Sequence, residues 1–236
     1  MKDILLPVIE ECEKRGFNVD SDALRRFEIY YSFLVQENEK YNLTAITEKQ
    51  EVALKHFADC MFFASRLDIK DGTKICDVGS GAGFPGMVIK ILRPKAEITL
   101  IDSLNKRVQF LSQLAQQLGL KVTALHSRAE EAGHNKLLRE SFDIVTARAV
   151  ANMSVLSELC LPLVKVGGCF AAMKGPAVDE EIENASGIKL LGGDKPQIFS
   201  EDLANIGQRR TVIFKKISQI PTKYPRSFAK ISKQPL

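Results

Sequence analysis

Glycines crowd a short segment that follows an aspartate, and this segment is the clearest candidate for a ligand site. It reads Ile75-Cys-Asp77-Val-Gly79-Ser-Gly81-Ala-Gly83-Phe84-Pro-Gly86. Glycines permit a tight turn and let a ligand approach the backbone, while the helix that follows offers free N–H groups. We therefore expect a small polar ligand here. An ordinary strand-to-helix turn is the alternative, and four glycines within eight positions argue against it.

Two classes of enzyme use a segment of this kind. The last three glycines satisfy the pattern G-x-G-x-x-G of dinucleotide-binding proteins, so an NAD-dependent oxidoreductase is one candidate. Asp77 favours the other, because Asp-x-Gly-x-Gly-x-Gly resembles the first motif of class I methyltransferases, which bind S-adenosylmethionine. Asp102 ends a second apolar run and can accept hydrogen bonds from both ribose hydroxyls. Both classes use such an acid, so Asp102 does not decide between them.

Further candidate site residues follow two later apolar runs. Ala129 and Glu130 come after the run at 122–125, and Arg148 ends the run at 142–147. In a parallel sheet the carboxyl ends of the strands line the ligand crevice. We therefore expect Glu130 and Arg148 at this crevice, with a surface ion pair as the alternative for each.

The order of these runs predicts the fold. Short apolar runs alternate with helical patterns after residue 73, which is typical of βαβ units on a parallel sheet. The predicted strands are 74–78, 97–101, 122–125, 142–147, 168–173 and 211–216, and the predicted helices among them are 87–92, 105–118 and 154–164. We expect an α/β fold of the class I, Rossmann-like type, with a doubly wound, mostly parallel seven-stranded sheet.

The two ends of the chain differ from this middle. Residues 1–70 show helical spacing of apolar residues and predict a helical extension packed on the core. Within it, Thr47 and Gln50 have the form of a capping box, which predicts a helix that starts just after Thr47. Residues 71–220 are expected to form the ligand-binding domain, a methyltransferase domain if the first motif is interpreted as that of class I methyltransferases. Residues 221–236, with three prolines, are expected to run extended or irregular over the surface.

Composition narrows the function classes. With 236 residues and 45% hydrophobic content the chain can bury one substantial core. Its first apolar run is too short for a secretory signal and no run approaches membrane-spanning length, so we expect a cytoplasmic protein that does not bind membranes. Five dispersed cysteines without a Cys-x-x-Cys pair predict free thiols, with neither a disulfide framework nor a metal site.

Positive charge gathers at the end of the sequence. Residues 203–236 hold eight Lys or Arg and no acid, while the net charge of the whole chain is only +4. Such a segment is a plausible phosphate-binding surface, and a solvated basic tail is the plain alternative.

Several motifs together resemble one family, the small-subunit ribosomal RNA methyltransferase G family, also called glucose-inhibited division protein B. The resemblance covers nearly the whole chain. It rests on Asn42 to Thr47, Lys55-His56-Phe57 with Asp59, Cys76 to Gly86, Asp102 to Arg107, Arg128-Ala-Glu130, Thr146 to Val150, and Lys223-Tyr-Pro-Arg226. The resemblance implies methyl transfer from S-adenosylmethionine to N7 of a guanine in the decoding-region hairpin of 16S rRNA. It also implies the small ribosomal subunit or its assembly intermediate as partner.

The resemblance also implies site residues. The family's cofactor contacts fall on Gly79, Phe84, Ala129, Glu130 and Arg148. With the residues of the wider class, the expected cofactor site comprises Asp77, Gly79, Gly81, Phe84, Asp102, Ala129, Glu130 and Arg148. The expected RNA contacts are Lys174, Arg209, Arg210, Lys223 and Arg226. The chain departs from the family at two places. Relatives tend to carry a tryptophan before Asn38, where this chain has Glu37. Near the basic end, Phe-Ala-Lys at residues 228–230 replaces the usual Gly-x-Pro.

Methylation of guanine N7 agrees with the absence of a recognisable catalytic dyad in the sequence. Guanine N7 has an in-plane lone pair and no proton, so methylation there requires no general base. The three histidines are dispersed and form no catalytic dyad with a nucleophile. Arg148 is expected to position the cofactor or the O6 edge of the base. The alternatives are a methyltransferase on another RNA, a protein or a small molecule, or a noncatalytic RNA-binding module, and the chain is expected to be a monomer.

Overall fold

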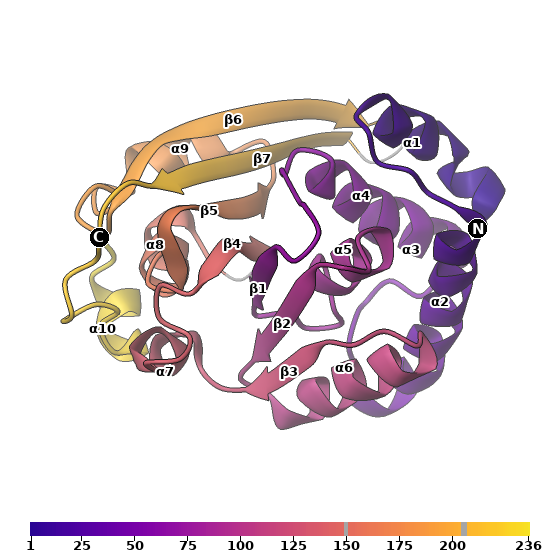
Figure 1. The fold of residues 1–236 in the computed structure, drawn as a ribbon, viewed down its shortest axis with the longest axis horizontal. Helices are drawn as coiled ribbons and strands as arrows, with labels where there is room; N and C mark the ends of the chain where they lie inside the picture. Colours follow the sequence, from indigo (N-terminus) through magenta and orange to yellow (C-terminus); the bar gives the residue numbers. More distant parts are fainter. Residues whose placement is uncertain (149–150, 204–206) are drawn as a thin grey trace.

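A seven-stranded sheet forms the centre of the computed structural model, which describes residues 1–148, 151–203 and 207–236 (Figure 1). The strand order is β3-β2-β1-β4-β5-β7-β6. The strands are β1 (Lys74–Val78), β2 (Glu97–Asp102), β3 (Thr123–His126), β4 (Phe142–Arg148), β5 (Val164–Lys174), β6 (Gly193–Leu203) and β7 (Gly207–Lys216). The first five are parallel, and β7 runs antiparallel to β5 and β6. The predicted sheet, doubly wound and mostly parallel, is confirmed.

Helices cover both faces of the sheet and enclose two separate clusters of buried apolar side chains. The first face carries α1 (Lys2–Lys14), α2 (Ser21–Tyr41), α3 (Lys49–Val52), the π-helical η1 (Ala53–Ala58), α4 (Asp59–Ala64), α5 (Gly86–Leu92) and α6 (Asn105–Gln117). The second face carries α7 (Ala129–His134), α8 (Met153–Cys160), α9 (Val178–Glu183) and α10 (Phe228–Lys233). The N-terminal helices thus share one core with the helices of the sheet domain. The proposed boundaries at residues 70 and 220 remain predictions.

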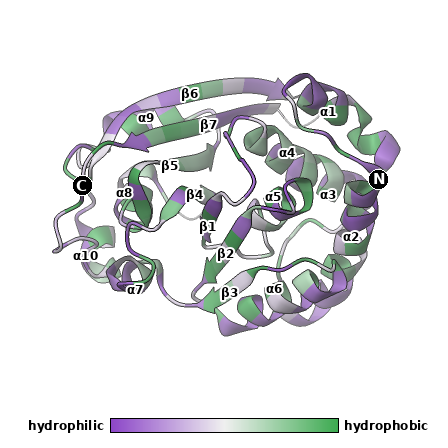
Figure 2. Cartoon of the chain, in the orientation of Figure 1, coloured by the Kyte–Doolittle hydropathy of each residue, from purple (hydrophilic) through white to green (hydrophobic). Residues whose placement is uncertain are grey.

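Side-chain alternation explains why the sheet separates two cores. In β1, Ile75 belongs to the first cluster, whereas Cys76 and Val78 belong to the second. Such a strand is buried on both faces and therefore reads as a continuous apolar run, as expected for the middle of a parallel sheet. Helices α2 and α6 instead show alternating hydrophilic and hydrophobic bands (Figure 2). Helix α6 buries its apolar face against β2 and β3, and α2 buries its own against α5 and α6.

Three expectations about the elements are wrong. The capping box at Thr47 and Gln50 does not form, because α3 begins at Lys49 after Glu48 and has no side-chain cap. The helix expected over 154–164 ends at Cys160, and Val164 already begins β5. The last residues are not irregular throughout, since α10 lies within them.

Strand β6 was not predicted at all. It pairs only with β7 and forms an edge of the sheet. Asp194, Lys195 and Gln197 are exposed, and Pro196 lies beside an irregularity in the pairing. Charges, a proline and a bulge are common on edge strands, and they remove the apolar alternation by which a strand is recognised. Ala149 and Val150, which end one of the family motifs, lie outside the described residues.

Within the described ranges, no helix combines the length and the apolar character needed to cross a bilayer.

Candidate functional site

The glycine loop, residues 79–86, follows β1 and is fixed to the end of β2. The N–H groups of Gly79 and Ser80 both donate to the carbonyl of Ile101, at 2.8 and 3.1 Å. Gly81 and Gly83 have φ values of 57° and 100°, in the region that favours glycine. The sequence therefore forms a tight turn here, as predicted.

Asp77 supports the loop from within the core. Its side chain has no exposed surface. One carboxylate oxygen accepts the N–H of Gly86 at 3.2 Å, and the other accepts the hydroxyl of Thr146 at 2.8 Å. Burial raises the pKa of this carboxyl group to about 6. Asp77 thus joins the loop to β4, and it can act on a ligand only through the shape of the loop.

A cavity of about 260 Å³ opens beside the loop, and we call it the loop cavity. It brings together four residues that the sequence predicted, Gly79, Asp102, Ala129 and Glu130. Its remaining walls are Val78, Ile101, Ser103, Ser127, Arg128, Leu159 and Phe228. The cavity therefore combines acids, backbone and apolar side chains at the carboxyl ends of β1, β2 and β3, where this architecture binds ligands.

Asp102 is the most constrained acid of the loop cavity. It is 2% exposed, and its two oxygens accept the N–H groups of Gly81 and Leu104, each at 2.9 Å. Arg107 lies 3.6 Å from the same carboxylate. These contacts fix the carboxylate at the cavity wall and tie the loop to β2. Ligand hydroxyls must use the remaining lone pairs of its oxygens.

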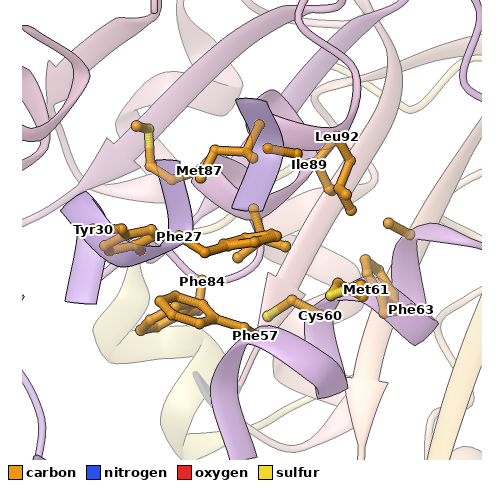
Figure 3. Close-up of a cluster of buried hydrophobic side chains, with 14 of the residues drawn as sticks. Phe27, Tyr30, Phe57, Cys60, Met61, Phe63, Phe84, Met87, Ile89 and Leu92 are labelled. Atoms are coloured by element: carbon orange, nitrogen blue, oxygen red, sulfur yellow. The ribbon is translucent and has the colours of Figure 1, made fainter. Parts of the chain in front are cut away.

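Phe84 of the loop is enclosed by aromatic rings from the N-terminal helices (Figure 3). Its ring stacks on Tyr30 with centroids 5.2 Å apart and lies 4.6 Å from His56. The Tyr30 hydroxyl donates to the carbonyl of Ala82 in the loop at 2.5 Å. A Cβ atom on Gly83 would lie only 2.6 Å from that hydroxyl oxygen. The helical extension therefore shapes the ligand loop directly, a role that the sequence did not reveal for Tyr30 or His56.

Arg148 ends β4 and reaches the N-terminal helices. Its guanidinium donates to the carbonyl of Lys55 at 3.1 Å and to Nδ1 of His56 at 2.8 Å, and it lies 5.5 Å from the Phe84 ring. Nδ1 of His56 also lies 3.0 Å from the carbonyl of Lys55, and Nε2 lies 3.0 Å from the hydroxyl of Thr44. Burial and Arg148 lower the pKa of His56 to about 4, which keeps the ring neutral.

A second cavity, of about 270 Å³, lies next to Arg148, and we call it the Asp59 cavity. It is lined by Asp59, Phe62, Phe63, Arg148, Met173, Lys174, Gly175, Glu201, Arg209, Arg210 and Thr211. Three of the predicted RNA contacts therefore gather around one cavity at the carboxyl ends of β4 and β5. Asp59 belongs to a family motif, but nothing in its spacing predicted that it faces a cavity.

The three expected RNA contacts at the Asp59 cavity each have a polar partner within the protein. Arg209 lies 3.3 Å from Asp59, Arg210 lies 3.5 Å from Asp179, and Lys174 donates to the carbonyl of Ala151 at 2.7 Å.

The other two lie in the C-terminal segment. Lys223 is exposed, with its ammonium 5.3 Å from the ring of Tyr224. Arg226 instead donates from its guanidinium and its backbone N–H to Glu158, which is fully buried. Its charge is thus largely committed to holding the C-terminal segment on α8. The basic tail is in part a structural element.

Among the described residues, no group of three or more His, Cys, Asp or Glu side chains is arranged to hold a metal ion.

Comparison with known sequences decides the family. A profile of the GidB family, described as rRNA small subunit methyltransferase G, matches residues 23–201. The chain belongs to this family. It is 50% identical over 227 residues to the ribosomal RNA small subunit methyltransferase G of Bacillus licheniformis, which covers 95% of each chain. The corresponding protein of Bacillus velezensis is 48% identical over 231 residues, or 97% of each chain.

Solved structures agree on the fold. A SAM-dependent O-methyltransferase from Thermotoga maritima superimposes with a TM-score of 0.53 at 15% identity, covering 80% of this chain and 73% of that one. At this identity the likeness shows the fold alone. With the family shown, the resemblance found in the sequence is confirmed and the NAD-dependent oxidoreductase is excluded.

Proposed function

We propose that this member of the methyltransferase G family transfers a methyl group from S-adenosylmethionine to N7 of a guanine in the decoding-region hairpin of 16S rRNA. The observation that carries the proposal is that predicted site residues gather around two cavities at the carboxyl edge of the sheet, in a chain of this family. The loop cavity gathers Gly79, Asp102 and Glu130, and the Asp59 cavity gathers arginines. Arg148 contacts the loop residue Phe84 and lines the Asp59 cavity.

The residues of the loop cavity fit the cofactor. Asp102 offers a fixed carboxylate to the ribose hydroxyls, as acids at the end of the second strand do in this architecture. Leu159 and Phe228 provide apolar surface for a flat base, and Glu130 stands at the same wall. When bound, S-adenosylmethionine supplies an electrophilic methyl group on a sulfonium sulfur.

The reaction requires alignment and no proton transfer. The N7 lone pair would bond to the methyl carbon as the carbon–sulfur bond breaks, and that bond's electrons would stay on sulfur as a neutral thioether. The guanine ring would take the positive charge. The contribution of the protein is to hold the base against the loop, and alignment of this kind can supply roughly 7–11 kcal/mol.

Arg148 is placed to assist this alignment from the side. A guanidinium aimed at N7 would oppose the charge that develops there, whereas one beside O6 or the cofactor would not. Its bonds to Lys55 and His56 fix its direction. Arg148 is therefore a positioning residue in this proposal, and its neutral neighbour His56 adds no further charge.

RNA would reach the site over the basic rim. Arg209 and Arg210 border the Asp59 cavity, and Lys223 is exposed nearby in the sequence that follows β7. Phosphates would meet these cations, while Arg226 remains paired with Glu158. We infer a monomer that acts in the cytoplasm on the small ribosomal subunit or its assembly intermediate.

Mapping of 16S rRNA from cells with and without this protein tests the proposal. Cleavage of the RNA at 7-methylguanosine should occur at one guanine of the decoding-region hairpin in the parent and should be lost in the deletion. Purified protein with tritium-labelled S-adenosylmethionine should restore it on small subunits from the deletion strain. An unchanged cleavage pattern, or label recovered in protein, would contradict the proposal.

A further inference from the structure

Asp59 is a buried carboxylate that the fold itself does not explain. It is 7% exposed, and one of its oxygens lies 3.3 Å from Nε of Arg209. The helical backbone runs without interruption from Lys49 through η1 to Ala64, so Asp59 caps no helix. Burying a charge is costly unless it is paired and hydrogen-bonded. A single contact with Arg209 leaves most of the acceptor capacity of this carboxylate unused.

The surroundings of Asp59 have the character of a base-binding site. The Asp59 cavity measures about 270 Å³, close to the lower limit of roughly 300 Å³ for small-molecule sites. Phe62, Phe63 and Met173 give it apolar walls, and the guanidinium of Arg148 stands on its border. Enzymes that modify a base hold it out of its stack between such walls and read its Watson–Crick edge by hydrogen bonds.

The charges of the cavity match guanine among the four bases. The Watson–Crick edge of guanine presents N1–H and the 2-amino group as adjacent donors, and a carboxylate accepts both. Adenine and cytosine present an acceptor at the ring position where guanine has N1–H, which a carboxylate repels. On the same ring, O6 and N7 are acceptors and suit a guanidinium and the methyl donor, respectively.

We propose that the carboxylate of Asp59 recognises the target guanine by accepting hydrogen bonds from N1–H and the 2-amino group. Arg148 contacts the loop as well as the Asp59 cavity, so O6 and the neighbouring N7 face the loop. The opposite edge of the ring then faces Asp59. The negative carboxylate also offsets the positive charge that the ring acquires. This inference rests on the proposed function, because it assigns a subsite to its substrate.

The first test compares Asp59→Asn with Asp68→Asn, which changes an exposed carboxylate beyond α4. The substrate is small subunits from cells that lack the enzyme, and the readouts are kcat and KM for methyl transfer. The amide keeps the shape but places a donor against a donor, so kcat/KM should fall about 100-fold in Asp59→Asn alone. Circular dichroism and the Kd for S-adenosylhomocysteine should match the wild type. An unchanged kcat/KM in a folded variant would overturn the inference.

The second test changes the base. Small subunits are reconstituted with 16S rRNA that carries inosine at the target position, which removes only the 2-amino group. The wild type should lose about tenfold in kcat/KM, whereas Asp59→Asn should lose no more than twofold further, because its amide can no longer accept hydrogen bonds from both donors of guanine. Full wild-type activity on inosine, or equal losses in both proteins, would overturn the inference. A wild type that methylates neither RNA nor subunits would instead contradict the proposed function.

Discussion

The loop cavity and the Asp59 cavity both lie at the carboxyl edge of the sheet, yet they are assembled differently. All but two of the residues that line the loop cavity fall between 78 and 130 and follow three consecutive strands. The Asp59 cavity draws on α4, on the ends of β4 and β5, and on the β6–β7 pair. The first is a local construction that recurs wherever this fold binds a nucleoside. The second depends on distant segments, and it can therefore vary with the substrate.

Arg148 tests whether the two cavities are independent. Arg148→Ala should lower methyl transfer about a thousandfold, because it removes a buried guanidinium that contacts the loop residue Phe84 and borders Asp59. A thousandfold loss corresponds to about 4 kcal/mol of transition-state stabilisation. The measurement is the initial rate on small subunits, with Arg25→Ala on the exposed face of α2 as control. Near-normal activity in a folded variant would mean that methyl transfer does not depend on the contact of Arg148 with the loop and the Asp59 cavity.

His56 links the helical extension to Arg148 and should make the protein sensitive to acid. Its pKa of about 4 lies below the usual 6.5, so between pH 6.5 and 4 the unfolded chain binds a proton that the folded chain does not. Stability therefore falls as the pH is lowered, by up to roughly 3 kcal/mol from this group.

Urea unfolding at pH 7 and pH 4.5 measures this effect. His56→Gln cannot lose this stability, so the wild type should lose more than the variant between the two pH values. His126→Gln, which changes an exposed histidine, should behave as the wild type. If the free energy of unfolding depends equally on pH in the wild type and in His56→Gln, protonation of His56 does not destabilise the folded protein. Asp77, whose pKa is raised to about 6, acts in the opposite sense in all these proteins and cancels from the comparison.

Tyr30 should give the smallest effect, confined to the loop cavity. Tyr30→Phe keeps the stacked ring but leaves the buried carbonyl of Ala82 without its donor. An unsatisfied buried carbonyl costs about 1–3 kcal/mol. Calorimetry should show a Kd for S-adenosylhomocysteine raised about tenfold, with binding of small subunits unchanged. Tyr31→Phe removes an exposed hydroxyl that donates to Thr47 and should leave the Kd unchanged. If both variants have the same Kd, the helical extension does not influence ligand binding at the loop.

The same difference between the cavities explains what the sequence could predict. Gly79, Asp102, Ala129 and Glu130 each lie at the end of a strand or within four residues after it, so the rule that carboxyl ends of parallel strands meet was enough to bring them together. The central parallel strands β1 and β4 were predicted because they are largely apolar runs buried on both faces.

Asp59 and β6 could not be predicted in this way. Asp59 lies among apolar residues of a helix, and only the packing of that helix near β7 gives it Arg209 as a neighbour. Strand β6 carries charges and a proline because its outer edge has no partner strand in the sheet. The pairing of Arg226 was equally hidden, because Glu158, its buried partner, lies on a helix 68 residues earlier. Charge counted along the chain does not reveal such pairs.

Phe228 closes one wall of the loop cavity, although it follows every strand in the sequence. It is held there by the segment that Arg226 fastens to Glu158. During synthesis the glycine loop, its acids and the N-terminal helices leave the ribosome long before this wall exists. A nascent chain can therefore shape its nucleoside pocket early but completes it only after residue 228 has emerged.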